Sequence, residues 1–521
     1  MEVKQSSAKM ITALQAVEKI KDNDTIITGG FVGTGVAEEL MIALEKRFLE
    51  QNQPRDLTLV YAAGQGDSKD RGGNHLAHEG LIKRVIGGHW GLVPKLQKLA
   101  FEEKLEAYNL PQGVIAHMLR DIAGKKPATL STVGLDTFVD PRVEGGKVNK
   151  KAKEDIVELF EIDGKECLRF KQFKPSVALI RGTTADTRGN ITFEKEALKI
   201  EAMAIAAATT NSGGVVIAQV ENVVDAGELR PHSVVVPGVM VDYIVKASVE
   251  NHQQTFGSEF DPAFVGEVAC EHHDLDPLPM SVKKIMGRRA CFELQNGDIV
   301  NLGIGAPEAV AMVAAEEGVI DNFTLTAEPG VIGGVPAGGL DFGASYNPEA
   351  IIDQPYQFDF YDGGGLCIAY LGMAQLDMEG NVNVSKFSGR VAGAGGFINI
   401  SQNTHKVVFM GAMLSGKIEF TSCYGEMKLE KNSGGRKFVD KVEQITFSGK
   451  RAIENGQDIL YVTERCVFRL VKEGVELIEI APGVDLHQDI LEQMDFKPLI
   501  SPDLKLMDPR IFAEEKMGIK N

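Results

Sequence analysis

The hydrophobic positions of this chain recur as short apolar runs, each followed by a glycine-rich loop and then by an amphipathic stretch. Residues 24–30 (DTIITGG) open one such unit, and a helical pattern follows over residues 36–47. Residues 298–305 (DIVNLGIG) open another, followed by a helical pattern over residues 308–317. A strand, a glycine loop and a helix in this order form the repeating unit of a parallel α/β sheet.

The two units belong to a longer internal repeat. Residues 185–192 (ADTRGNIT) resemble residues 376–383 (LDMEGNVN), with an offset of 377 − 186 = 191 residues. The same offset aligns residues 216–218 (VIA) with residues 407–409 (VVF). A register held over two separate blocks predicts two tandem, open, doubly wound α/β domains of one plan.

We predict the boundary between the copies near residue 280, which gives domains 1–280 and 281–521. Residues 248–278 are polar and lead into a Pro-Leu-Pro sequence, a pattern typical of a linker. The first copy also carries an insertion at about 65–170, because residues 64 to 178 span 114 positions where the equivalent 330 to 369 span 39. Its lysine-rich stretch 147–153 predicts a solvated loop.

Composition narrows the class of partner and the compartment. The net charge of −18 argues against nucleic acid as the main partner, although a local positive patch or a helix N-terminus could still accept a phosphorylated small ligand. No apolar run reaches the roughly 18 residues of a membrane span, and the N-terminus lacks a signal-peptide core. The six cysteines show no CxxC spacing, which argues against a disulfide framework or a zinc site. We therefore expect a soluble cytoplasmic protein.

One carboxylate distinguishes the second copy from the first. Residues 58–64 (TLVYAAG) align with residues 324–330 (TLTAEPG), so that Glu328 stands where the first copy has Ala62. A charge at the end of an apolar strand is costly unless it is solvated or used. Pro329 favours extended backbone at Glu328, which predicts the carboxylate at the C-terminal end of the strand. A surface glutamate opening a loop remains the alternative from spacing alone.

Glycine loops accompany this glutamate. Residues 330–339 (GVIGGVPAGG) could approach a ligand with bare backbone, and residues 393–397 (GAGGF) could offer peptide N–H groups to an oxyanion. One carboxylate among glycine loops fits covalent catalysis on a carbonyl. Residues 30–35 (GFVGTG) have the wrong glycine order for a dinucleotide fingerprint, and no P-loop sequence occurs.

Histidines and basic residues carry weaker signals. The adjacent pair His272 and His273 is more typical of a solvated loop than of metal ligation. Structural interpretations are also favoured for His75, His78 and His89. Four basic residues could bind phosphates, namely Lys69, Arg71, Lys386 and Arg390. Each is also typical of an ordinary surface charge.

Longer motifs carry a resemblance to a known family. The chain resembles the family I coenzyme A transferases, most closely the bacterial propionate and acetate CoA-transferase group, over essentially its whole length. The motifs are residues 78–84 (HEGLIKR), 88–90 (GHW), 111–113 (PQG), 137–142 (TFVDPR), 333–339 (GGVPAGG), 357–365 (QFDFYDGGG) and 478–486 (IEIAPGVDL).

The resemblance implies both halves of the family's fold in one chain, and transfer of CoA between a short-chain acyl-CoA, such as acetyl-CoA or propionyl-CoA, and a short-chain carboxylate. It places the nucleophile at Glu328, a catalytic glutamine at Gln112, and the oxyanion loop at Gly395 and Gly396. The residues expected to bind CoA or substrate are Gly30, Phe31, Val32, Gly33, Gly35, Gly64, Gln65, Lys386 and Arg390.

The resemblance further implies no cofactor beyond CoA as a substrate, and a homo-oligomer with a tetramer favoured. Two positions depart from the family pattern. Ala37 stands where members often carry Pro, and residues 327–330 read AEPG where the two-subunit members typically read Ser-Glu-Asn-Gly. Pro329 has no N–H group, so it cannot donate to an oxyanion.

A glutamate has an ordinary pKa of about 4.3, so we expect Glu328 to be ionised at neutral pH and to attack without a general base. The expected intermediates are an acyl-glutamyl anhydride and a glutamyl-CoA thioester, with ping-pong kinetics. The alternatives are an acyl-CoA hydrolase, in which water resolves the intermediate, and a non-catalytic acyl-CoA-binding protein on the same fold.

Overall fold

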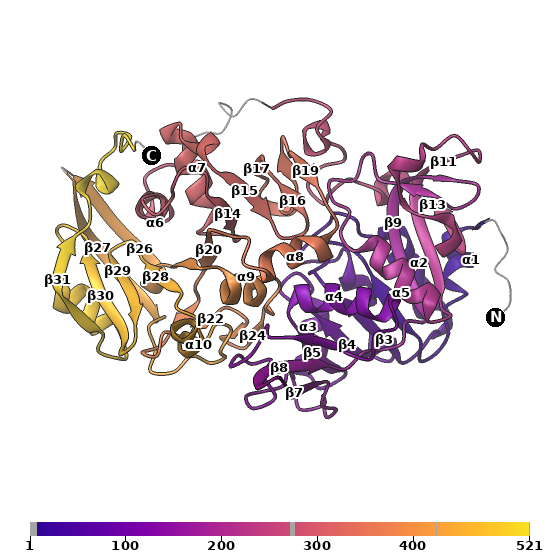
Figure 1. The fold of residues 1–521 in the computed structure, drawn as a ribbon, viewed down its shortest axis with the longest axis horizontal. Helices are drawn as coiled ribbons and strands as arrows, with labels where there is room; N and C mark the ends of the chain where they lie inside the picture. The colour runs from indigo at the N-terminus through magenta and orange to yellow at the C-terminus, as the bar shows by residue number, and fades with distance from the viewer. Residues whose placement is uncertain (1–7, 271–276, 424, 520–521) are drawn as a thin grey trace. The chain divides into compact units, whose positions relative to one another are not determined.

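The computed structural model describes residues 8–270, 277–423 and 425–519, which divide into two units (Figure 1). The first unit comprises Met1–Ala269, Ala327–Asp359 and Arg390–Asn399, and the second comprises Cys270–Thr326, Phe360–Gly389 and Ile400–Asn521. The predicted domains divide the chain once, near residue 280, whereas two later segments belong to the first unit. One of these segments begins at Ala327, next to the candidate nucleophile.

The first unit contains a parallel sheet. Its strand order is β1 (Lys9–Met10), β13 (Tyr243–Lys246), β11 (Val215–Val224), β9 (Val177–Asp186), β2 (Thr25–Thr28), β3 (Leu57–Tyr61), β4 (Ile82–Gly87) and β5 (Glu106–Asn109). The strands of this path all pair in parallel. At its side, β10 (Ile191–Thr192) pairs antiparallel with β9 and with β12 (Val234–Val236).

Alternate residues of the strands face opposite sides of this sheet, and helices cover both sides. Ile27 and Val60 pack into one apolar cluster with residues of α4 (Gln112–Ala123) and α5 (Ala202–Asn211). Their neighbours Ile26 and Leu59 pack into another cluster, which contains residues of three helices. These helices are α1 (Ala13–Val17), α2 (Glu38–Gln51) and α3 (Pro94–Phe101). The doubly wound arrangement is as predicted.

The insertion extends this sheet. It supplies the strands β4 and β5, and also a three-stranded antiparallel sheet in the order β6 (Thr129–Ser131), β8 (Lys165–Phe170) and β7 (Val157–Ile162). Lys150, Lys151 and Lys153 are exposed, in agreement with the predicted solvated loop.

The second unit has a parallel core followed by a mixed edge. The core strands are β15 (Thr324–Ala327), β14 (Ile299–Leu302), β20 (Ile368–Gly372), β25 (Lys406–Met410) and β28 (Asp458–Val462), in that order. The sheet continues with β29 (Cys466–Val471), β30 (Gly474–Ile480) and β31 (Leu499–Leu506). In this edge, β29 pairs antiparallel with both of its neighbours and β31 pairs parallel with β30. Its helices include α6 (Val282–Cys291), α7 (Glu308–Glu317) and α10 (Gly449–Glu454), and a long hairpin joins β26 (Leu414–Cys423) to β27 (Glu426–Arg436). No helix among the described residues has the length and apolar character needed to cross a bilayer.

Strand order confirms the internal repeat. The order β3, β2, β9, β11 in the first unit matches β15, β14, β20, β25 in the second. The strands β9 and β20 begin 368 − 177 = 191 residues apart, and β11 and β25 begin 406 − 215 = 191 residues apart. These displacements equal the offset found in the sequence.

The predicted linker differs from the structure. Its middle packs into the first unit instead of connecting two bodies loosely, with Gln254 and Phe256 buried. Gln254 Nε2 donates to the carbonyl oxygen of Lys195 at 2.9 Å. A polar composition concealed this burial because the polar side chains are satisfied by hydrogen bonds. His272 and His273 lie outside the described residues.

Candidate active site

The strand β15 ends at Ala327, and Glu328 follows it as predicted. The chain then turns sharply, because the N–H of Gly330 donates to the carbonyl oxygen of Ala327 at 3.1 Å. Gly330 has φ of 121°, and a Cβ atom there would lie 2.1 Å from the carbonyl oxygen of Ile352. Glycine is therefore required at this turn, which fixes the exit of the chain behind the carboxylate.

Burial changes the ionisation of Glu328. The side chain is half-buried, and loss of solvation raises its pKa from 4.5 to about 7. The expectation of an ordinary pKa and full ionisation at neutral pH is therefore wrong. Ionisation of this carboxyl group is therefore incomplete near neutral pH.

The glycine loop 393–396 is held by the ends of β4 and β5. The N–H of Gly395 donates to the carbonyl oxygen of Gly88 at 2.7 Å, and the N–H of Ala394 donates to Oδ1 of Asn109 at 2.9 Å. The backbone N–H of Gln112, the first residue of α4, donates to the carbonyl oxygen of Gly395 at 2.9 Å. The insertion thus supplies all three anchors of a loop that lies nearly 300 residues further along the chain.

Gly396 lies against the candidate nucleophile. A Cβ atom at Gly396 would be 3.2 Å from Cδ of Glu328 and 3.3 Å from its Oε1. Within the described part of the chain, the N–H of Gly396 has no hydrogen-bond partner. The N–H of Gly395 is already bonded to the carbonyl oxygen of Gly88, so of the two predicted oxyanion donors only Gly396 has an open N–H among the described residues; the oxyanion role itself stays a prediction.

Gln112 is buried beside the same loop. Its Nε2 donates to Oε1 of Gln354 at 3.0 Å, and Nε2 of Gln354 donates to Oε2 of Glu201 at 2.9 Å. A Cβ atom at Gly395 would lie 3.6 Å from Oε1 of Gln112. The structure therefore brings Gln112 to the glycine loop that contacts Glu328. Gln354 and Glu201 were not predicted as site residues, because no spacing or motif in the sequence sets either apart.

The N-terminal glycine loop is packed close to the same strand end. Phe31 and Val32 share an apolar cluster with Ala327 and Val331, which flank Glu328 in sequence. Val32 has φ of 54°, an unfavourable conformation for a β-branched residue. Its N–H donates to the carbonyl oxygen of Gly64 at 2.7 Å, which helps to hold the strained backbone.

The remaining glycines of the N-terminal loop are buried against protein atoms. A Cβ atom at Gly30 would lie 2.6 Å from Val36, one at Gly33 would lie 2.3 Å from Phe256, and one at Gly35 would lie 2.3 Å from Ile200. These residues shape a packed loop, and their predicted contact with CoA stays a prediction.

Gln65 and His89 line the neighbouring backbone. Nε2 of Gln65 donates to the carbonyl oxygen of Thr28 at 2.9 Å, so this donor serves the fold. A Cβ atom at Gly64 would lie 2.5 Å from Nδ1 of His89, and one at Gly395 would lie 3.7 Å from Cδ2 of His89. Burial lowers the pKa of His89 to about 4, which keeps the imidazole neutral at physiological pH. No spacing in the sequence distinguishes this histidine from a structural one.

The basic candidates differ in their burial and in their partners. The guanidinium of Arg71 lies 3.9 Å from the ring centroid of Phe256 and donates to Oε1 of Gln253 at 2.9 Å, so it is occupied within the protein. Lys69 and Arg390 are exposed. Lys386 is half-buried and belongs to the second unit. Phosphate contacts by Lys386 and Arg390 stay predictions.

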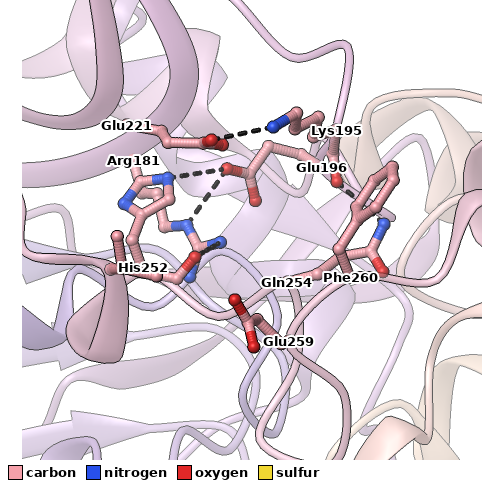
Figure 2. A pocket seen from close by; sticks show the side chains of 9 residues that line it. Arg181, Lys195, Glu196, Glu221, His252, Gln254, Glu259 and Phe260 are labelled. Carbon is pink, nitrogen blue, oxygen red and sulfur yellow. Dashed lines mark hydrogen bonds and ion pairs between the residues drawn. The ribbon is translucent and has the colours of Figure 1, made fainter.

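The first unit also contains a small charged cavity of about 120 Å³ (Figure 2). Arg181 Nε lies 3.0 Å from Oε1 of Glu196, and Nζ of Lys195 lies 2.8 Å from Oε1 of Glu221. Ligand pockets usually measure ~300–1,000 Å³, so this cavity is too small for CoA. Neither Glu328 nor Gln112 lines it. No group of three or more metal-ligating side chains was found among the described residues.

A half-buried glutamate therefore lies at a strand end of an α/β fold, against an anchored glycine loop. A family model described as coenzyme A transferase matches residues 10–247. The caffeate CoA-transferase of Acetobacterium woodii is 47% identical over 518 residues, which cover 98% of this chain and 99% of that protein. The acetate CoA-transferase YdiF of Escherichia coli K12 is 43% identical over 511 residues, covering 98% and 96%. The chain belongs to the coenzyme A transferase family and is a CoA-transferase.

A solved structure confirms the fold. The acyl-CoA transferase YdiF of Escherichia coli O157:H7, crystallised as a thioester complex with CoA, superposes with a TM-score of 0.94 at 41% identity. The similarity covers 99% of this chain and 98% of that one.

Proposed function

We propose that this enzyme transfers CoA between a short-chain acyl-CoA and a short-chain carboxylate through covalent intermediates on Glu328. The observation that carries the proposal is the contact between the Glu328 carboxyl group and Gly396, whose N–H lacks a partner among the described residues. The contact supports the proposal because attack on a thioester carbonyl requires a nucleophile with a backbone N–H donor close to it.

The reaction begins when the ionised carboxylate of Glu328 attacks the thioester carbonyl. The C–S bond breaks, CoA leaves as the thiolate, and an acyl-glutamyl anhydride remains. The thiolate then attacks the Glu328 carbonyl carbon, which forms the glutamyl-CoA thioester and releases the first acid as its carboxylate. An incoming carboxylate reverses the two steps, so the charge balances and the kinetics are ping-pong.

Positioning supplies most of the rate. Holding two reactants in a reactive geometry contributes on the order of 7–11 kcal/mol, and one oxyanion donor contributes roughly 3–4 kcal/mol. The Gly396 N–H serves as this donor, and the Gln112 amide orients the reacting carbonyl. Since Pro329 has no N–H, the donor has to come from the loop that carries Gly396. No cofactor other than CoA takes part.

The carboxylic acids proposed as substrates follow from the resemblance to related enzymes. Acetate and propionate are the first substrates to test, with lactate and butyrate as further acceptors. The name of the Acetobacterium relative adds caffeate, an aromatic acid, to the panel. One methylene changes the free energy of discrimination between two acids by only about 1–3 kcal/mol, whereas an aromatic ring demands a much larger pocket. Activity with caffeate therefore distinguishes an enzyme for aromatic acids from one for short-chain acids. A homo-oligomer with a tetramer favoured is proposed as well, and light scattering measures it.

The decisive experiment mixes the protein with acetyl-CoA alone and digests it for mass spectrometry. A CoA adduct is expected on the peptide that contains Glu328, and it should disappear in Glu328→Gln. An adduct on another residue, or no adduct despite transferase turnover, would overturn the assignment. Acyl-CoA consumption that acceptor carboxylates do not stimulate would identify a hydrolase instead.

A further inference from the structure

Three buried side chains form a continuous hydrogen-bonded series that ends at the glycine loop. Gln112 donates to Gln354 at 3.0 Å, and Gln354 donates to Glu201 at 2.9 Å. Glu201 and Gln112 are each 1% exposed, and Gln354 is 0% exposed. The series joins the start of α4 to Gln354, the first residue of α8 (Gln354–Asp362), and then to the residue before α5, all within the first unit.

The hydrogen bonds of the series set the orientation of both amide groups. Oε2 of Glu201 accepts the hydrogen bond from Nε2 of Gln354, so Gln354 turns its NH₂ group toward Glu201. Its carbonyl oxygen then faces Gln112, which must in turn present its own NH₂ group to Gln354. One N–H and the carbonyl oxygen of Gln112 remain, and this oxygen would lie 3.6 Å from a Cβ atom at Gly395. Glu201 thus determines which end of the Gln112 amide faces the loop.

Backbone constraints hold Glu201 in place. Ile200 has φ of 55°, a costly conformation for a β-branched residue. The carbonyl oxygen of Ile200 accepts the backbone N–H of Gln354 at 2.7 Å, so residues 200 and 201 hold both the main chain and the side chain of Gln354. The side chain of Ile200 also fills the space beside Gly35, where a Cβ atom would lie 2.3 Å from its Cδ1.

The side chain of Glu201 destabilises the fold, so a structural role alone does not account for it. Its Oε1 has no hydrogen-bond partner among the described residues, and no cation is paired with it. Burial, with a smaller contribution from the charge of Asp353, raises its pKa to about 8. A half-satisfied buried carboxyl group destabilises a fold relative to an apolar side chain of the same volume. A role of Glu201 in orienting the groups of the active site would account for this loss of stability.

We propose that Glu201 is a positioning residue that acts through Gln354 to set the orientation of the Gln112 amide beside the Gly395–Gly396 loop. The proposal rests on the proposed function, in which Gln112 orients the reacting carbonyl. Glu201 itself touches neither the substrate nor Glu328.

The test compares Glu201→Ala, Glu201→Gln, Gln354→Ala and Gln112→Ala, with Glu196→Gln as the matched control. Glu196 is another buried glutamate of the first unit, paired with Arg181 in the cavity of Figure 2. Glu201→Ala is expected to lower kcat about 10–100-fold while the KM for acyl-CoA changes much less, because misplacement of a catalytic group costs turnover. Glu201→Gln keeps an acceptor oxygen and should recover most of the lost turnover. Glu196→Gln should leave kcat unchanged.

A double-mutant cycle separates positioning from a general structural role. In a Gln112→Ala background, adding Glu201→Ala should have little further effect on kcat, because the amide that Glu201 orients is gone. Losses that multiply independently would overturn the proposal, as would unchanged kcat in Glu201→Ala. If Glu201→Ala fails to fold, Gln354→Ala provides the same cycle. Failure of the wild-type enzyme to form an adduct on Glu328 would reject the proposed function. A normal adduct in the wild type together with normal kcat in Glu201→Ala would reject only the role of Glu201.

Discussion

At the scale of the residue, Glu328 meets two opposing demands. It must be ionised to attack a carbonyl, yet its burial raises its pKa to about 7. Burial also removes the water that would solvate the anion and hydrolyse an anhydride. The result is a carboxylate that is more basic when ionised but is ionised in only part of the molecules near neutral pH.

This balance predicts a pH dependence. Only the ionised form of Glu328 attacks, so the single-turnover rate of adduct formation with acetyl-CoA should rise as pH increases through about 7 and level off above it. Rapid-quench measurements between about pH 5 and pH 9 report this profile. A rate that is flat down to pH 5 would show that Glu328 keeps an ordinary pKa.

The same raised pKa predicts an effect on stability. The pKa of Glu328 is about 7 in the folded protein and near 4.5 when unfolded, so between these values the folded state binds more protons. The contribution of Glu328 to stability is therefore full below about 4.5 and is lost as pH rises through about 7. Glu328→Gln does not titrate, so relative to wild type it should be about 1–3 kcal/mol more stable at pH 8 than at pH 5.

Urea unfolding of the wild type and Glu328→Gln at the two pH values measures this difference. Comparing two proteins that differ at one position cancels the titration of the other groups. An equal stability difference at both pH values would contradict the prediction.

At the scale of the element, the sequence predicted individual helices and strands better than the contacts between them. The structure places α7 at Glu308–Glu317, as the pattern predicted, because local periodicity determines a helix. The helix expected from residue 36 begins instead at Glu38, since Val36 and Ala37 still belong to the packed loop. The contacts of the loop at Gly395 join residues nearly 300 positions apart, and no local pattern records such a pairing.

The loop itself predicts the effect of a small change. In Gly396→Ala, the new Cβ atom would meet the Glu328 carboxyl group at 3.2–3.3 Å, so the loop or the carboxylate must shift. A displacement of this kind should lower kcat about 10–100-fold without a comparable change in thermal stability. Gly124→Ala, at the C-terminal end of α4 with its nearest neighbour at 3.5 Å, is the matched control.

Assays of kcat and melting temperature on both variants check this expectation. Wild-type turnover in a folded Gly396→Ala enzyme would exclude close contact between this loop and the reacting group. Reduced turnover in Gly124→Ala would show that the loss is not specific to the site.

At the scale of the whole molecule, the fold class and the internal repeat were predictable, whereas the composition of the units was not. The 191-residue offset and the strand order agree. The assignment of Ala327–Asp359 and Arg390–Asn399 to the first unit depends on tertiary contacts, which composition does not reveal. The candidate site could be predicted at Glu328, Gln112 and the glycine loop, but Gln354 and Glu201 required three-dimensional proximity.

This division predicts that residues 1–280 do not form an independent folded body. The fragment lacks Ala327 and Val331, which pack with Phe31, and also Ala337 and Ala344, which pack with Phe264. The exposed apolar surface should bind a hydrophobic dye and abolish cooperative unfolding. Dye fluorescence and thermal melts of the fragment and the full chain test this. A soluble fragment with a sharp melting transition would contradict it.

The difference between Ala62 and Glu328 sets the catalytic stoichiometry. Ala62 follows β3 as Glu328 follows β15, and it is fully buried in an apolar cluster. In the proposed mechanism the duplicated architecture therefore provides one reactive carboxylate per chain, with no second one at the equivalent strand end. Active-site titration should saturate at one covalently bound CoA per polypeptide, however many polypeptides assemble.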